Sequence, residues 1–178
     1  RSVSNDNPWA SPRLFFSLIN SCNDALYQFG QMVEKNRISR ELADVRYSEA
    51  MAIRCWAYLQ VSLHFADPEK GGVPYITEPL NSIESLDPAY LEKFPYLDLP
   101  TMIDSLLFAM ESIPYKDLIT DEGLITIMGY NTDLMYIDKQ YLLGELNLWK
   151  GNYHQAAIYF KTIMERGVSG NDLYDLHK

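Results

Sequence analysis

The apolar residues near the start of the chain recur with a period close to 3.6 between positions 12 and 36, which predicts a helix. Pro12 suits the first turn of that helix, and Ser11 is placed to cap its N-terminus. Polar side chains, among them Asn20 and Asn23, occupy much of the rest of its circumference. We therefore expect one face of this helix to lie in a core and the other to be polar.

A second helix is predicted from about residue 44 to residue 66, after a turn at 36–40. Its apolar residues cover nearly the whole circumference, and a helix of that kind is packed between other elements. Pro68 ends it, since the residue before a proline disfavours helical backbone. A third helix is predicted over residues 100–113, and Pro114 closes it.

The connections between these helices are long and irregular. Residues 67–80 are expected to be loop and extended chain, with a sharp turn at Gly71-Gly72. Residues 81–96 are interpreted as irregular because they combine two prolines with scattered aromatic residues. The segment 114–135 is ambiguous, and Leu124–Met128 within it fits either a short strand or a helical turn.

Two further helices, 136–150 and 152–166, flank Gly151, which is expected to be the C-cap of the first. A connection this short between two amphipathic segments predicts an antiparallel helix hairpin. We expect it to pack against the 44–66 helix. No strand alternation of useful length occurs, so the predicted fold is all-α, with a single domain over residues 1–178.

The spacing within this hairpin is that of a tetratricopeptide repeat, carried by Leu143, Gly144, Gly151, Tyr153, Ala156 and Phe160. Gly144 and Ala156 are small enough for the two helices to approach closely. Tyr153 and Phe160 are expected to fill the groove beside a neighbouring helix pair. Ile163 departs from the repeat pattern, and no proline closes the second helix. A generic helix hairpin is therefore the alternative, while the first two predicted helices are a candidate for a second, divergent repeat.

Composition excludes several functions. The chain holds 24 acidic and 15 Lys or Arg residues, a net charge of −9, and no basic cluster, which argues against nucleic-acid binding. No apolar stretch approaches the ~20 residues that span a bilayer. Cys22 and Cys55 have neither the number nor the spacing of a disulfide framework or metal site. We expect both to be free, buried thiols, because packed helices hold cysteines too far apart to bond unless their side chains converge.

Catalytic chemistry is not indicated. The sequence lacks the nucleophile elbow, the dinucleotide-binding and Walker loops and the zinc-protease motif. His64, His154 and His177 fall on separate predicted segments. We therefore expect no enzyme activity, cofactor or metal, and an all-helical enzyme is only a third hypothesis. Arg54, in a mostly apolar helix, is expected to be a buried partner of an acid or of helix carbonyls.

Four segments, in order along the chain, have the residue patterns of one known family. They are Glu49-Ala50 with Arg54-Cys55-Trp56-Ala57-Tyr58, Gly72-Val73-Pro74-Tyr75-Ile76-Thr77-Glu78, Ile103 through Ala109 with Ile113-Pro114, and Lys139 through Ile163. In these segments the chain resembles the SusD/RagB family of nutrient-binding outer-membrane lipoproteins. The likeness covers most of the chain, and its strength lies in the order of the four segments.

The resemblance implies a non-catalytic binding protein at the cell surface. Such a protein captures an oligosaccharide or another nutrient for a TonB-dependent, SusC-like transporter in the outer membrane. Family members are considerably longer, so we expect this chain to be the helical-repeat part of one. Their lipid-anchoring cysteine has no counterpart here, because Cys22 lies inside a predicted helix. The resemblance thus implies membrane association through a lipid anchor outside this chain.

The polar segment before the first predicted helix holds the candidate ligand-binding residues Asn5, Asp6, Asn7 and Trp9. Sugar-binding proteins stack pyranose faces on exposed aromatic rings and fix hydroxyls with amide and carboxylate groups. In SusD-like proteins the chain just before this helix contributes such contacts. Trp9 can instead pack over the helix start, and Trp56 and Trp149 are expected in the core.

A competing hypothesis has no sugar site. A tetratricopeptide adaptor binds peptide segments in a concave groove between its repeats. Such a groove is typically lined with Asn, Lys and Arg, which are scarce on the 136–166 hairpin. The sequence leaves the ligand of either type of protein open.

Overall fold

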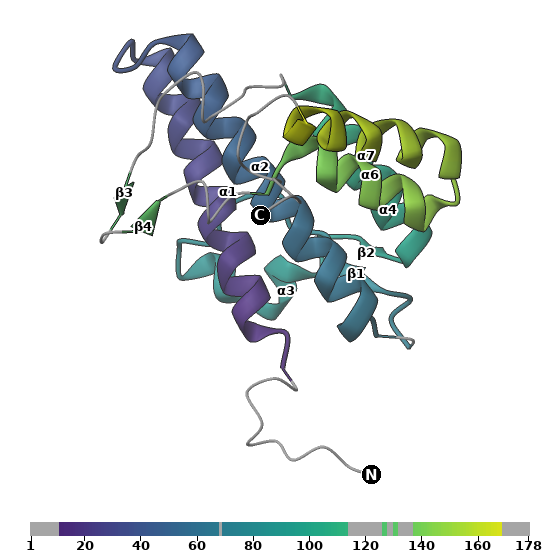
Figure 1. The fold of residues 1–178 in the computed structure, drawn as a ribbon. Helices are drawn as coiled ribbons and strands as arrows, with labels where there is room; N and C mark the ends of the chain where they lie inside the picture. The colour runs from purple at the N-terminus through teal and green to yellow at the C-terminus, as the bar shows by residue number, and fades with distance from the viewer. Residues whose placement is uncertain (1–10, 68, 114–125, 128–129, 132–136, 169–178) are drawn as a thin grey trace.

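The computed structural model describes residues 11–67, 69–113, 126–127, 130–131 and 137–168. Within these ranges the chain is mostly helical, in agreement with the predicted all-α class (Figure 1). The long helices there are α1 (Arg13–Glu34), α2 (Arg40–Phe65), α4 (Leu99–Ser112), α6 (Lys139–Lys150) and α7 (Tyr153–Val168). All five sequence-predicted helices therefore exist.

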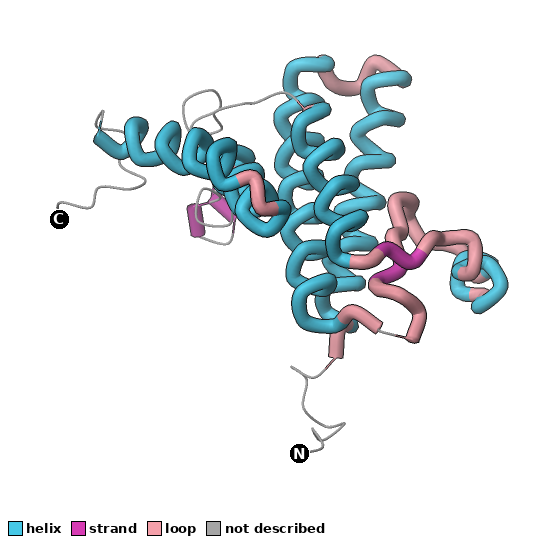
Figure 2. The backbone as a smooth tube through the Cα atoms, turned by 90° about the vertical axis from the view of Figure 1, so that its right-hand side faces the viewer, coloured by secondary structure: helices cyan, strands magenta, loops and turns pink. Residues whose placement is uncertain are grey.

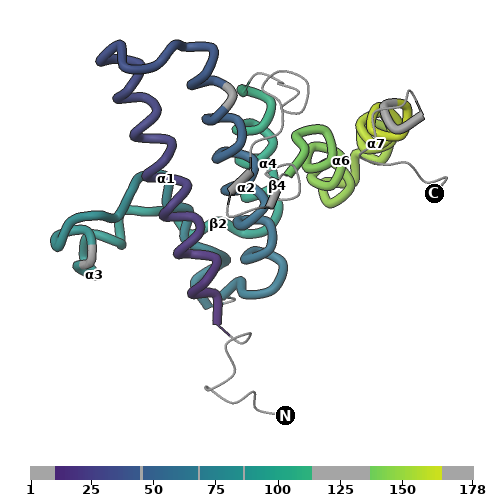
Figure 3. Tube along the Cα trace, turned by 60° about the vertical axis from the view of Figure 1, so that its left-hand side comes forward, coloured from purple at the N-terminus to yellow at the C-terminus, as the bar shows by residue number. Residues whose placement is uncertain are grey.

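The long helices pack in series. α1 and α2 form a hairpin, α4 packs on α2, α6 packs on α4, and α7 packs on α6. Figure 3 shows this order, with α1 at one side of the molecule and α7 at the other. Figure 2 shows the α6–α7 hairpin extending away from the α1–α2 pair. The core is centred on α2, α4 and α6, whose fully buried side chains include Tyr58, Leu59, Met102, Leu106, Leu142 and Leu146.

The prediction that the last hairpin packs against the 44–66 helix is wrong, because its main contact is with α4. α4 lies between them, and α6 contacts α2 only slightly. The reason is the width of the apolar face of α4. At about 100° per residue, its buried residues Met102, Ile103, Leu106, Leu107 and Met110 span enough of the circumference to cover both neighbours. The sequence identified this face but not its two partners.

Two predicted helix starts also change. α2 begins at Arg40 rather than near residue 44, because the Ser39 hydroxyl accepts a hydrogen bond from the Leu42 N–H at 3.2 Å. α1 begins at Arg13 with Pro12 in the N-cap position, so Ser11 is not its cap. Ser11 instead accepts a long hydrogen bond from the Arg13 N–H at 3.3 Å.

The segment 81–96 is more ordered than its prolines indicated. It contains the short helical turns η2 (Glu84–Leu86) and α3 (Pro88–Leu91), and Asp87 caps α3 by accepting from the Ala89 N–H at 2.9 Å. In Figures 2 and 3, α3 lies beyond α1, on the side away from α7.

Two small antiparallel ladders join the irregular connections. β1 (Val73–Pro74) pairs with β2 (Tyr96–Leu97), and β3 (Thr126–Ile127) pairs with β4 (Tyr130–Asn131). Gly72 precedes β1 with φ +139°, and a Cβ there would lie 1.9 Å from the Leu97 carbonyl oxygen. Only glycine fits this close approach. The strand interpretation of Leu124–Met128 is correct for Thr126–Ile127, and most of 114–135 lies outside the described residues.

The α6–α7 hairpin confirms its predicted turn. Gly151 adopts the left-handed conformation at φ +84°, and its N–H donates to the Leu148 carbonyl at 3.1 Å. Gly144 permits the predicted close approach, since a Cβ there would lie 2.7 Å from the ring of Phe160. Ala156 is buried as predicted, at 2% exposure.

Two aromatic predictions in this hairpin are wrong. Tyr153 is 70% exposed, and Phe160 packs within the hairpin, on Gly144 and against Tyr141, so neither fills a groove beside a neighbouring helix pair among the described residues. Trp149 is 50% exposed rather than in the core. Among the described elements, α7 contacts chiefly α6, so hairpin residues that face neither α4 nor the α6–α7 interface stay open to solvent. Trp56 does pack against the core, beside Phe15.

Candidate functional site

The sequence-predicted ligand residues Asn5, Asp6, Asn7 and Trp9 lie outside the described residues. The structure therefore brings none of them to a site. Polar side chains gather instead at two places within the described ranges. At the first place, side chains of α1 hydrogen-bond to the backbone of the loop that follows β1. The second place is an open pocket between α2 and α4.

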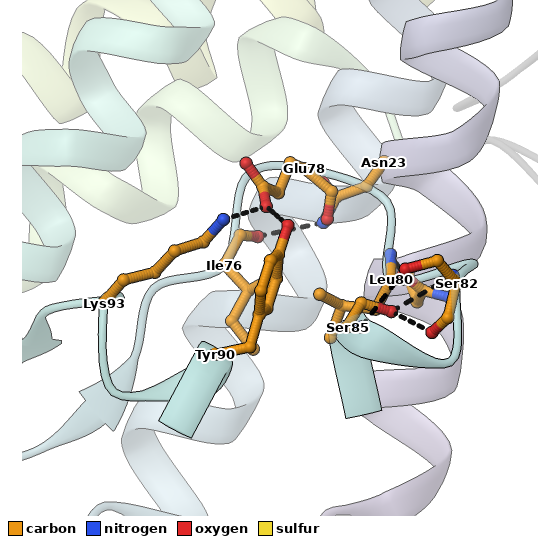
Figure 4. Close-up of polar contacts among 9 residues, drawn as sticks. Asn23, Ile76, Glu78, Leu80, Ser82, Ser85, Tyr90 and Lys93 are labelled. Atoms are coloured by element: carbon orange, nitrogen blue, oxygen red, sulfur yellow. Dashed lines mark hydrogen bonds and ion pairs between the residues drawn. The ribbon is translucent and has the colours of Figure 1, made fainter. Parts of the chain in front are cut away.

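The polar face of α1 holds the loop that follows β1. The Asn23 amide group donates to the carbonyls of Ile76 and Glu78, at 2.9 and 3.1 Å (Figure 4). One turn away, the Asn20 side-chain oxygen accepts from the Leu80 N–H at 2.7 Å. Tyr58 on α2 also holds this loop. Its hydroxyl donates to the Ile76 carbonyl oxygen and accepts from the Ile76 N–H, each at 2.7 Å. These polar groups are structural, and they replace the backbone pairing that an extended loop lacks.

A hydrogen bond and an ion pair at the surface link Glu78 to a later part of the same loop. Glu78 accepts a hydrogen bond from the Tyr90 hydroxyl and forms an ion pair with Lys93 (Figure 4). The Lys93 ammonium also lies 3.7 Å from the centroid of the Tyr90 ring. The hydrogen bond from Lys93, more than that from Tyr90, lowers the pKa of Glu78. Because these groups satisfy one another, they are a poor candidate for a ligand site.

The pocket has a volume of about 550 Å³ and opens between α2, α4 and the extension of β1. This volume is within the usual range for small-molecule sites, roughly 300–1,000 Å³. α2 contributes Met51 and Arg54, and the β1 extension contributes Tyr75. α4 contributes Thr101, Asp104, Ser105, Phe108, Ala109 and Ser112. Apart from Ala109, which packs against the core, these residues lie outside the buried face of α4.

Arg54 is the buried cation of this pocket, at 7% exposure. One terminal nitrogen, Nη1, donates to the Asn23 side-chain oxygen at 2.9 Å, and the other, Nη2, lies 3.1 Å from the Met51 sulfur. The prediction that Arg54 is buried is correct. The predicted partner, an acid or helix carbonyls, is wrong. A neutral amide takes that place because Asn23, which also holds the loop, faces α2.

The rim combines an aromatic ring with hydroxyl groups. Phe108 is 77% exposed. The Ser105 and Ser112 hydroxyls donate to helix carbonyls at 2.9 and 2.8 Å, and their oxygens keep acceptor capacity. Asp104 forms an ion pair with Lys150 at 2.7 Å. An apolar ring face, hydroxyl oxygens and a cation suit a small polar ligand with one flat apolar side.

The two thiols are buried in the core. Cys22 and Cys55 are free and buried, which confirms their expected place in the core. Burial raises the pKa of Cys22 to about 11 and that of Cys55 to about 12, although the charge of Arg54 acts in the opposite direction. Thiols with such values are protonated at neutral pH and are poor nucleophiles.

No group of three or more His, Cys, Asp and Glu side chains in the described part of the chain is placed to hold a metal ion. None of the described helices has the length and apolar content needed to cross a membrane.

Comparisons with protein-family models, with curated proteins and with solved structures find no match to this chain. The SusD/RagB resemblance therefore rests on the four sequence segments alone.

Sequence reasoning missed Phe108 and Ser105 as site residues. The local pattern assigns both residues only to a helix, because nothing in it shows that α2 and Tyr75 leave that face of α4 uncovered. One sequence feature does indicate Phe108. It is an aromatic residue outside the apolar face formed by Met102, Leu106 and Met110.

Proposed function

We propose that this chain is part of a non-catalytic, SusD/RagB-like binding protein at the cell surface. In this proposal it captures an oligosaccharide or another nutrient and passes it to a TonB-dependent, SusC-like transporter in the outer membrane. The parent protein is held at the membrane by a lipid anchor outside this chain. The helix pairs, with their tetratricopeptide-like spacing, serve as the scaffold.

One observation carries the proposal. Three of the four segments on which the family resemblance rests contribute to a single pocket. Arg54 comes from the first segment, Tyr75 from the second, and Ser105 and Phe108 from the third. These segments are far apart in the sequence, and their meeting at one concave surface supports a shared role in ligand binding.

The chemistry of the pocket suits a saccharide better than a reaction. The exposed Phe108 ring offers a flat apolar surface for a pyranose face. Arg54, Thr101 and Ser105 line the same pocket and supply groups for ring hydroxyls.

A calorimetric titration with a panel of oligosaccharides tests the function. Phe108→Ala should weaken binding of the best ligand by about 1–3 kcal/mol, by analogy with aromatic stacking on nucleobases. Tyr153→Ala is the matched control, because Tyr153 is similarly exposed, at 70% against 77% for Phe108, and lies on α7, outside the pocket. Equal losses from the two variants, or no binding by any saccharide, would remove the pocket from the proposal.

Trp9 has its own test in the full-length parent. Trp9→Ala should weaken saccharide binding by about 1–3 kcal/mol if its ring stacks on a sugar. Unchanged affinity would exclude Trp9 from the site. The 178-residue chain alone should bind more weakly than the parent, because SusD-like proteins supply further loops from their C-terminal half.

A protein-binding adaptor is the second candidate, and one feature favours it. Large apolar residues are exposed along the α6–α7 hairpin, namely Tyr141, Leu148, Trp149, Tyr153 and Met164. Stacked helix repeats bury such a face against a neighbour. A peptide library that binds the chain while the saccharide panel does not would favour this candidate.

A further inference from the structure

Arg54 is a buried cation whose hydrogen-bond partners in the described part of the chain are both uncharged. The Asn23 oxygen is a good acceptor, but a thioether sulfur such as that of Met51 is a weak one. Buried charges in proteins are normally paired with an opposite charge, since an unpaired ion loses its hydration without compensation. Nη2 therefore lacks a charged acceptor among the described residues, and both Arg54 and Met51 line the pocket.

The positive charge of Arg54 reaches the wall of the pocket. Burial raises the pKa of Tyr75, and the charge of Arg54 acts against that rise. The nearest acid on the rim, Asp104, is offset by Lys150 at 2.7 Å. Arg54 is thus the cation among the residues that line the pocket, although the whole chain carries a net charge of −9.

A carboxylate group is the ligand chemistry that best complements the Arg54 guanidinium. The planar guanidinium binds carboxylates through two parallel hydrogen bonds, and these charge-assisted bonds are stronger than bonds between neutral groups. A carboxylate oxygen that replaces the sulfur of Met51 as the partner of Nη2 supplies the missing charge. Phe108 and Tyr75 then face the apolar side of the same ligand, and the Ser105 hydroxyl faces its polar edge.

We propose that this pocket binds an acidic sugar, a uronate whose carboxylate pairs with the Arg54 guanidinium and whose ring lies against Phe108. The inference rests on the proposed function and names the ligand class of the same site.

The test compares a charged ligand with its uncharged methyl ester. The chain is titrated with trigalacturonate and with its methyl ester, and separately with a glucuronate trisaccharide and its ester, by calorimetry or protein-observed NMR. At least one free acid should bind five- to tenfold more tightly than its ester. Equal affinity of acid and ester, or tighter binding by the esters, overturns the inference.

Asp104→Asn gives a second, independent measurement without altering the core, because Asp104 is exposed. Removal of this negative charge should tighten binding of the free acid two- to fivefold and leave the ester unchanged. Glu111→Gln is the matched control, since it makes the same change of charge on an exposed residue of α4 outside the pocket lining. An equal effect of the two variants indicates only a general charge effect and contradicts the assignment.

Arg54→Met should abolish the preference for the acid over the ester, provided that circular dichroism shows the variant to be folded. If neutral oligosaccharides bind and neither acid does, the inference fails and the proposed function stands. If no saccharide binds, both fail. If a peptide with a free C-terminal carboxylate binds the pocket more tightly than any uronate, the ligand class is wrong.

Discussion

Asn23 shows how much of the fold depends on a single polar side chain. It is 1% exposed, donates to two loop carbonyls, and accepts a hydrogen bond from Arg54. The sequence placed it on the polar face of a helix, which is correct for its helix but not for its environment. Its partners are more than thirty residues away, so local periodicity contains no signal for them.

Asn23→Ala should lower the free energy of unfolding by about 1–3 kcal/mol, because it leaves buried polar partners without their hydrogen bonds. Gln28→Ala is the control, since Gln28 is exposed on the same helix and its loss should change stability by less than about 0.5 kcal/mol. Urea denaturation measures both. Similar values for the two variants would mean that solvent satisfies the loop carbonyls equally well.

Gly144→Leu should destabilise the protein by about 1–3 kcal/mol through overpacking. A Cβ at this position already lies 2.7 Å from the Phe160 ring. In a Phe160→Ala background the same substitution should cost less, because the ring that it meets is absent. A double-mutant cycle on melting temperature tests the contact, and strictly additive effects would contradict the close approach of α6 and α7.

The two cysteines should react only after unfolding. Burial raises the pKa values to about 11 and about 12, so both thiols are protonated at pH 8 and shielded from reagent. Titration with an aromatic disulfide reagent should detect no fast-reacting thiol in the native protein. Two thiols should react in the denatured, non-reduced protein, and none there would show that Cys22 and Cys55 are bonded.

At the scale of elements, the sequence predicts which helices form better than it predicts which helices pack together. The helices follow from periodicity, and the α6–α7 turn follows from Gly151. The short helical turns and two-residue strands of 73–97 escaped prediction, because such brief elements depend on tertiary contacts rather than on local pattern. The place of α4 between α2 and α6 escaped for the same reason.

Gly151→Ala should destabilise the hairpin by about 1–2 kcal/mol, since a side chain is strained at φ +84°. Gly30→Ala provides a control of opposite sign. Gly30 lies within α1 with no atom near its would-be Cβ, so alanine there should stabilise by about 0.5–1 kcal/mol. Thermal melts of the two variants should move in opposite directions, and movement in the same direction would contradict the assigned backbone conformations.

At the scale of the molecule, the candidate site depends on how helices meet. The sequence identified Arg54 as buried and located Tyr75 in a loop. It did not bring them together with Phe108, because the pocket exists only once α4 packs on α2 and the 76–80 loop is seated on α1. Proteins often build binding sites at such junctions of elements. The apolar face of the α6–α7 hairpin is likewise visible only in three dimensions.

The central claim is that the pocket between α2 and α4 binds a saccharide. Its most direct test is an NMR titration of the isotope-labelled chain with neutral and acidic oligosaccharides, followed amide by amide. We expect weak binding, with a Kd of roughly 1 mM, and shifts concentrated at residues 51–54, 73–76 and 101–112. Shifts confined to the α6–α7 hairpin, or none with any saccharide, would contradict the account.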